Sequence, residues 1–350
     1  MTALENELEL ILFTPEGEPV RHTIPQAPKE QLLLTAWQFT NALTDPNHRN
    51  SNSYMKPSQQ LYNWLIAPIQ KELQANKINT LLFSMDSGLR TLPVAALNDG
   101  QQFLIEKYSM GLIPSVSLMD TRYQAIQKSE VLAFGASEFK NLNALPAVPV
   151  ELKTITEERG GKAFLNEKFT RNNIVRQRQN NPYPIVHFAT HAEFKSGDLQ
   201  ESFIQLWDDK LNLNDLRQLR LNSPPVELLV LSACRTAVGD EKAELGFAGL
   251  AVAAGVKSAL ASLWYVSDEG TLGLMNEFYD HLSETPIKAE ALREAQLAML
   301  RGKVTIENGE LRGSDTRGGI VLPPSLKSNN SRSLSHPYYW SGFTMIGSPW

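Results

Sequence analysis

Two segments of the chain end in side chains that can carry out acyl-transfer chemistry. The apolar run 185–189 leads to His191, and the apolar run 226–232 leads to Cys234. Such runs are typical of buried strands in a parallel sheet, and functional sites form just beyond the carboxyl ends of those strands. We therefore expect His191 and Cys234 to lie at one edge of a sheet, close enough for the two side chains to meet.

The two residue types complement each other chemically. A thiol near neutral pH is only a few per cent thiolate, so it needs a base or positive surroundings before it attacks a carbonyl. An imidazole, with a pKa of about 6.5, can take the thiol proton and later return it to a leaving amine. Backbone N–H groups near Cys234 and Ala192 can donate to the oxyanion of the tetrahedral intermediate. These are the requirements of acyl transfer, and two residue types at plausible positions meet them here.

A structural role would explain either residue alone. A single cysteine is most often a small buried apolar side chain, and a histidine near a strand end often hydrogen-bonds to backbone. Only the joint placement of the two favours catalysis. A zinc site at His187 and His191 is disfavoured, because the Glu of a His-Glu-x-x-His helix is missing and the segment is predicted as strand. The glycine-spaced segment 246–255 matches neither a dinucleotide nor a phosphate loop.

Both segments resemble motifs of the CHAT family, which comprises caspase-like domains related to separase. Residues 187–192 match its His-Phe-Ala-Thr-His-Ala motif, and residues 231–236 match Leu-Ser-Ala-Cys-x-Thr. Further matches follow in order at residues 86–97, 114–117, 145–148, 261–268, 291–296 and 336–343. The resemblance implies a caspase-like fold and an endopeptidase with Cys234 as nucleophile and His191 as base. It implies no metal or organic cofactor. Within the family, the chain most resembles the HetF-like CHAT proteases of cyanobacteria.

The resemblance also implies a role for Asp268. In the related separases, an acidic residue at the end of a Trp-x-Val-x-Asp stretch lines the pocket for a basic side chain. Asp268 would then bind an Arg or Lys before the scissile bond, Arg through a bidentate pair. Two alternatives stay open: Asp268 caps the following helix, or Glu241 and Glu244 supply the acid instead.

The surrounding pattern predicts an α/β fold with a mainly parallel sheet covered by helices on both faces. Helices are predicted over 150–159, 245–254, 268–282 and 288–301. We expect a non-catalytic N-terminal half over 1–128 and a catalytic half over 129–350. The Gly-, Ser- and Asn-rich stretch 302–336 is expected to be a mobile insertion with a small hairpin near 304–311.

Composition limits the classes of function. The 350 residues are 42% hydrophobic and carry a formal charge of -5, so the composition does not predict a basic surface that binds nucleic acid. No secretory signal or membrane span is recognisable, and one cysteine excludes an internal disulfide. We expect a cytoplasmic protein whose partner is a protein substrate, with no nucleic acid or membrane partner; the need for an activating protein stays open. The alternative function is a catalytically silent caspase-like scaffold that binds protein partners.

Overall fold

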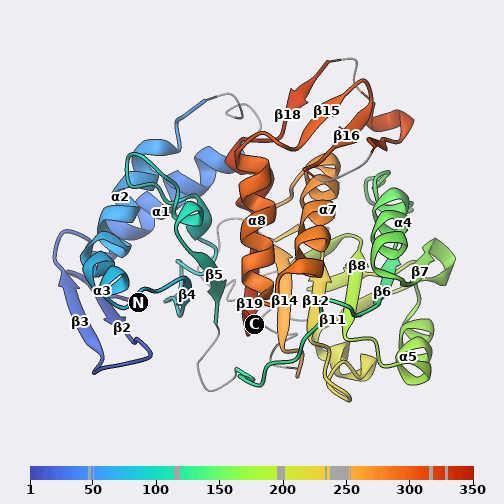
Figure 1. Cartoon of the computed structure of the whole chain (residues 1–350), viewed down its shortest axis with the longest axis horizontal. Helices are drawn as coiled ribbons and strands as arrows, with labels where there is room; N and C mark the ends of the chain where they lie inside the picture. Colours follow the sequence, from blue (N-terminus) through green and yellow to red (C-terminus); the bar gives the residue numbers. More distant parts are fainter. Residues whose placement is uncertain are drawn as a thin grey trace.

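The structure is a computed structural model that describes residues 1–45, 49, 51–113, 119–194, 202–232, 235–236, 252, 254–314, 318–327 and 330–350. Its centre is an eight-stranded sheet in the order β4-β5-β19-β14-β12-β8-β6-β7. The strands are β4 (Thr80–Phe83), β5 (Ser109–Leu112), β6 (Val131–Gly135), β7 (Gly161–Leu165), β8 (Ile185–Ala189), β12 (Leu228–Leu231), β14 (Ser258–Ser262) and β19 (Phe343–Gly347). The sheet brings both halves of the chain into one layer (Figure 1).

Most neighbouring strands of this sheet run parallel. The five strands from β14 to β7 share one direction, whereas β19 pairs with β14 antiparallel. β5 and β4 then run parallel to β19. The prediction of an α/β fold with a mainly parallel sheet is therefore confirmed, and the carboxyl ends of β8, β12 and β14 lie at one common edge.

The helices α4 (Val148–Arg159), α7 (Asp268–Glu284) and α8 (Lys288–Leu300) lie side by side across one face of the sheet (Figure 1). α7 begins where the Ser267 hydroxyl accepts the Gly270 N–H at 3.3 Å, which satisfies one of the free donors of its first turn. The shorter α5 (Arg171–Asn180) is capped by Thr170 in the same way. The helix predicted over 245–254 lies almost entirely outside the described residues.

The N-terminal residues form a separate layer beside β4 and β5. A three-stranded sheet of β1 (Thr2–Ala3), β2 (Leu8–Leu12) and β3 (Val20–Ile24) precedes α1 (Lys29–Thr44), α2 (Met55–Leu65) and α3 (Gln70–Ala75). α1 packs against α2 and also touches α9 (Pro337–Trp340), from the other end of the chain. The division of the chain at residue 128 stays a prediction.

Two small sheets cover other parts of the molecule. Residues 305–333 contain β15 (Thr305–Glu307), β16 (Glu310–Arg312), β17 (Ile320–Val321) and β18 (Arg332–Ser333), in the order β17-β16-β15-β18. The expected hairpin is the β15–β16 pair, whereas the mobility of the insertion stays a prediction. The second sheet, β11-β10-β9-β13, contains β9 (Ala192–Phe194), β10 (Phe203–Gln205), β11 (Lys210–Asn212) and β13 (Arg235–Thr236).

Short 3₁₀ helices connect the larger elements. They are η2 (Ala67–Ile69), η3 (Val94–Ala96), η4 (Leu104–Glu106), η6 (Asn166–Lys168), η7 (Leu213–Leu219) and η8 (Pro324–Leu326). Within the described part of the chain, none of the helices combines the length and the hydropathy that a membrane crossing requires.

Candidate active site

His191 lies just beyond the carboxyl end of β8, where its ring is oriented by a backbone carbonyl. Its Nε2 atom is 2.7 Å from the carbonyl oxygen of Asn143. A carbonyl oxygen can only accept, so Nε2 must carry the proton of this bond. In the neutral imidazole the lone pair then lies on Nδ1, which makes Nδ1 the basic atom of the ring.

A loop that follows β6 positions this histidine. We call residues 136–147 the 136–147 loop. It is closed by a hydrogen bond from the Leu145 N–H to the Ser137 carbonyl at 2.9 Å, and its Ala136 N–H donates to the Ala189 carbonyl of β8 at 3.0 Å. The Phe139 ring lies against the His191 ring, with the two centroids 4.7 Å apart. The loop therefore holds the imidazole by a hydrogen bond and by packing.

The chain on both sides of Cys234 runs beside the chain around His191. Cys234 and Ala233 themselves lie outside the described residues. The Ser232 N–H donates to the Phe188 carbonyl at 3.1 Å, and Arg235 pairs with Glu193 in the parallel β13–β9 ladder. Ala192, whose backbone we predict to bind the oxyanion, is the first residue of β9 and pairs with Ile204 of β10.

Asp268 lies at the start of α7, where it is largely buried. The helix cap is Ser267, so the structure assigns the capping role to the preceding residue. Burial raises the pKa of Asp268 to about 6, although a hydrogen bond from the Ala147 backbone N–H works against this. The Tyr265 hydroxyl lies 3.4 Å from its Oδ1, and burial together with Asp268 raises the pKa of Tyr265 to about 12. Within the described residues, no cation forms an ion pair with Asp268.

A cleft of about 890 Å³ opens beside Asp268. One wall comes from the 136–147 loop, through Ala144 and Pro146. Asn41 and Thr44 of α1 and the residue Arg49 also line it. The rest of the lining comes from aromatic, polar and acidic side chains of the segment 264–269 and from Tyr338, Ser325 and Leu326. The cleft thus lies next to the carbonyl that orients His191, and its described lining contains two carboxylates.

The second carboxylate of the cleft already has a partner. Glu269 forms an ion pair with Arg332 of β18. Burial pushes the pKa of Glu269 upward, but its own backbone N–H and the Arg332 guanidinium outweigh this effect and leave the pKa lowered. The two neighbouring acids therefore differ: Glu269 is neutralised by the insertion, whereas Asp268 keeps a raised pKa.

His187, four residues before His191, is fully buried inside the sheet. Its Nδ1 lies 3.0 Å from the Tyr279 hydroxyl of α7. Its Nε2 lies 3.1 Å from Glu151 Oε1 of α4, but without the alignment of a hydrogen bond. His187 thus connects β8 to two helices. Among the described residues, no three potential ligands gather to hold a metal ion.

The residues that orient His191 could not be identified from the sequence. Asn143 acts through its backbone carbonyl, which any residue would supply, so its identity carried no signal. Phe139 is an aromatic residue in a polar loop, and that contrast is a weak signal that a ring is needed there. Glu241 and Glu244, the alternative acids, lie outside the described residues.

A family model described as the CHAT domain matches residues 55–348. The chain belongs to the CHAT family. It is also similar to tetratricopeptide repeat protein 28 of Mus musculus, with 22% identity over 86% of this chain. That match covers 14% of the mouse protein, so this CHAT chain spans about a seventh of its relative's length.

This CHAT chain is also similar to several solved structures. The Saccharomyces cerevisiae separase–securin complex matches with a TM-score of 0.48 and 11% identity, over 94% of this chain and 21% of the other. The complex of the Porphyromonas gingivalis RgpB pro- and mature domains matches with a TM-score of 0.48 and 11% identity, over 92% and 77%. A crystal structure of the Arg-specific cysteine proteinase gingipain R matches with a TM-score of 0.46 and 12% identity, over 90% and 74%.

Proposed function

We propose that this CHAT chain is a cysteine endopeptidase that cleaves a protein partner after a basic residue. The observation that carries the proposal is the hydrogen bond from His191 Nε2 to the Asn143 carbonyl. This bond leaves the lone pair of the neutral ring on Nδ1, which is the protonation state that a general base requires. The bond supports catalysis because the described residues on both sides of Cys234 run beside the chain around His191.

The chemical steps follow from these groups. Nδ1 of His191 takes the proton of the Cys234 thiol, and the thiolate attacks the scissile carbonyl carbon. The protonated ring then returns the proton to the leaving amine, and the Asn143 carbonyl supports the doubly protonated ring throughout. Water next attacks the thioester, with His191 again as base, and releases the new carboxyl group. The backbone N–H groups of Cys234 and Ala192 are our candidates for binding the oxyanion.

Asp268 is our candidate for recognising the basic side chain. It is partly desolvated and lacks a cation partner within the described residues, so an arginine or lysine that enters the cleft gains a strong charge-assisted contact. The neighbouring Glu269 is less suitable, because Arg332 already binds it. The substrate is thus a protein with an exposed basic residue, cut at few sites.

Further proposals concern the type, activation, location and partners of this chain. An assignment to the HetF-like proteases, the need for an activating protein, and the cytoplasmic location all await experiment. So does the absence of nucleic-acid and membrane partners.

The single cysteine of the chain permits a direct test of the proposed base. Every alkylation by iodoacetamide reports on Cys234, so the rate as a function of pH gives the pKa of that thiol. We expect a thiol pKa below the ordinary value of about 8.5 in the unmodified chain, and a return toward that value in His191→Ala. His22→Ala is the matched control, because His22 pairs with Glu72 in the N-terminal layer. Identical pH profiles for the unmodified chain and His191→Ala would contradict the proposal.

Cleavage itself is tested by a search for new N-termini in a proteome incubated with the protein. We expect new termini after Arg or Lys that are absent with Cys234→Ala. If both proteins leave the proteome uncut and Cys234 reacts as an ordinary thiol, the catalytically silent scaffold becomes the better explanation.

A further inference from the structure

The N-terminal layer supplies part of the cleft, although sequence analysis assigned it no catalytic role. Asn41 and Thr44 of α1 line the cleft beside Asp268 and Glu269. The opposite side of α1 faces its own core, where Leu32, Phe39 and Leu43 are fully buried. α1 therefore forms a side wall of the cleft and is held firmly from behind.

A second, smaller groove continues along the same helix. It is lined by Ala36, Trp37, Thr40 and Asn41 of α1, together with Thr91, Leu92 and Leu263. Asn41 lines both the groove and the cleft, and Leu263 of the groove precedes Trp264 of the cleft. The groove and the cleft are thus neighbouring sections of one surface along α1. We call the groove the Trp37 groove.

Trp37 is an unusual residue for a solvent-facing position. Its side chain remains 55% exposed, although tryptophan is highly buried on average. Exposed aromatic side chains with apolar neighbours often mark binding sites. Here the apolar neighbours are Leu92 and Leu263.

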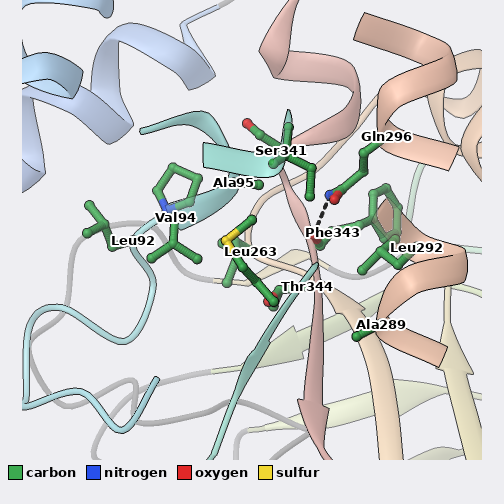
Figure 2. Close-up of a pocket in the computed structure, with 13 residues that line it drawn as sticks. Leu92, Val94, Ala95, Leu263, Ala289, Leu292, Gln296, Ser341, Phe343 and Thr344 are labelled. Carbon is green, nitrogen blue, oxygen red and sulfur yellow. Dashed lines mark hydrogen bonds between the residues drawn. The ribbon is translucent and has the colours of Figure 1, made fainter. Parts of the chain in front are cut away.

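The floor of the Trp37 groove is preformed. Leu92 and Leu263 also face a small packed interior space, which Figure 2 shows between the loop 92–95, β19 and α8. There the Gln296 side chain donates to the carbonyls of Trp340 and Phe343, each at 2.9 Å, and ties α8 to the start of β19. A ligand would therefore meet a fixed surface and would lose little free energy in ordering it.

We propose that the Trp37 groove binds an apolar side chain of the substrate, about three residues before the basic residue at the cleavage site. The proposal rests on the proposed peptidase function and adds a second specificity site to it. Trp37 would act as a specificity-determining residue that makes no contact with the reacting atoms.

The length of α1 sets the spacing. Thr44, in the cleft, and Trp37, in the groove, are seven residues apart, or about 10 Å at a rise of about 1.5 Å per residue. An extended peptide covers about 3.3 Å per residue, so about three residues span this distance. A basic side chain beside Asp268 would thus have a peptide neighbour over Trp37 about three positions away.

The direction of the peptide follows from the position of the base. The carbonyl of the basic residue must lie near His191, which is on the side of the 136–147 loop. The residues that precede it are then the ones that can extend toward α1. The substrate class is therefore a peptide with an apolar residue, such as Leu or Phe, followed two or three positions later by Arg or Lys.

The test uses peptides with a fixed Arg at the cleavage site and either Leu or Glu at the third position before it. We expect the unmodified chain to cleave the Leu peptide about tenfold more efficiently, since a partly buried Leu side chain contributes about that factor. Trp37→Ala should remove this preference and leave cleavage of the Glu peptide unchanged. Leu34→Ala is the matched control, because Leu34 is also on α1 and 52% exposed, but does not line the groove.

A binding measurement separates the two proposals. The Cys234→Ala variant of the full chain is mixed with the same peptides carrying a fluorophore, and affinity is read by fluorescence polarisation. Tighter binding of the Leu peptide that is lost with the added Trp37→Ala change supports the groove, even if the unmodified chain cleaves nothing. Cleavage that shows no dependence on the third position, or an equal loss for both peptides in Trp37→Ala, would overturn it.

Discussion

The two edges of the central sheet differ in how their buried charges are paired. At the edge where β12 and β14 begin, Glu227 and Lys257 are both buried and lie 2.8 Å apart. At the opposite edge, beyond the end of β14, Asp268 is partly buried and no cation pairs with it in the described part of the chain. The first edge pairs Glu227 with Lys257, although burial lowers the pKa of the neighbouring Lys288 to about 8, whereas the second edge keeps a carboxylate without a cation in the described part of the chain.

The difference separates stability from function. A buried pair that loses one partner destabilises the fold, because the remaining charge stays desolvated. A partly buried carboxylate without a cation costs some stability, which is regained when a cationic ligand binds or when the carboxylate takes up a proton. Changes at the first edge should therefore alter stability, and changes at the second should alter substrate choice.

The largest effect is expected at His191, the proposed general base. His191→Ala should lower kcat/KM by about 10²–10⁴-fold, because it removes the group that takes and returns the proton. The free energy of unfolding should stay within about 0.5 kcal/mol, since the ring lies at the edge and outside the core. Peptide hydrolysis and urea unfolding measure the two quantities. Full activity in this variant would contradict the proposed difference between the two edges, because His191 would then have only a structural role, as His187 has.

At the edge with Glu227 and Lys257, we expect a substitution to lower the stability of the protein by a comparable free energy. Glu227→Gln leaves Lys257 buried without its charged partner and should lower the free energy of unfolding by about 3–5 kcal/mol. The double change Glu227→Met with Lys257→Met should recover most of this loss. Urea unfolding measures both. A changed preference for Arg over neutral residues, at equal amounts of folded protein, would break the proposed separation of the edges.

Asp268→Asn should have an intermediate effect on selectivity. Loss of the charge-assisted contact should lower kcat/KM for Arg substrates by about 10–100-fold and leave neutral substrates nearly unchanged. The matched control is Glu269→Gln, which removes a carboxylate that Arg332 already neutralises. An equal loss in both variants would mean that the two acids act together, and would move the recognition site away from Asp268 alone.

Asp268→Asn should also stabilise the protein, because a raised pKa means that folding disfavours the charged carboxylate. Because folding raises the pKa of Asp268 from 3.8 to about 6, the buried carboxyl costs nothing below the lower value. The cost grows as the pH rises through both values, so Asp268→Asn should add about 1–2 kcal/mol to the free energy of unfolding at pH 8. At pH 4 the two proteins should differ little. Urea unfolding at the two pH values measures this.

The smallest effect is a pH dependence of selectivity. The ratio of kcat/KM for Arg and neutral substrates should fall severalfold as the pH drops through about 6, because Asp268 takes up a proton there. The ratio cancels the titration of Cys234 and His191, which affects both substrates alike. In Asp268→Asn the ratio should be flat, and a persistent fall in that variant would assign the titration to another group.

Local pattern was sufficient for several elements of the fold. The apolar spacing predicted helices over 268–282 and 288–301, and the structure has α7 over 268–284 and α8 over 288–300. The apolar runs near 185–189 and 226–232 contain β8 and β12, which are neighbours in the sheet. These features depend on residues a few positions apart, so the sequence displays them directly.

Long-range pairing was not predictable in this way. No strand was predicted near the carboxyl end of the chain, yet β19 lies between β14 and β5, antiparallel to β14 and parallel to β5. β5 was not predicted at all, and it packs with α8 from the other half of the chain. Pairing of this kind depends on which surfaces meet after collapse, and no local pattern records that.

The sequence alone determined which reactive side chains exist and that His191 follows the end of a strand, because residue type and strand pattern are local properties. Only the tertiary structure decided which ring nitrogen carries the proton, since a backbone carbonyl from a distant loop accepts it. It also decided the raised pKa of Asp268 and brought α1 to the side of the cleft. Burial and the orientation of hydrogen bonds depend on neighbours that lie far away along the chain, so they exist only once the chain has folded.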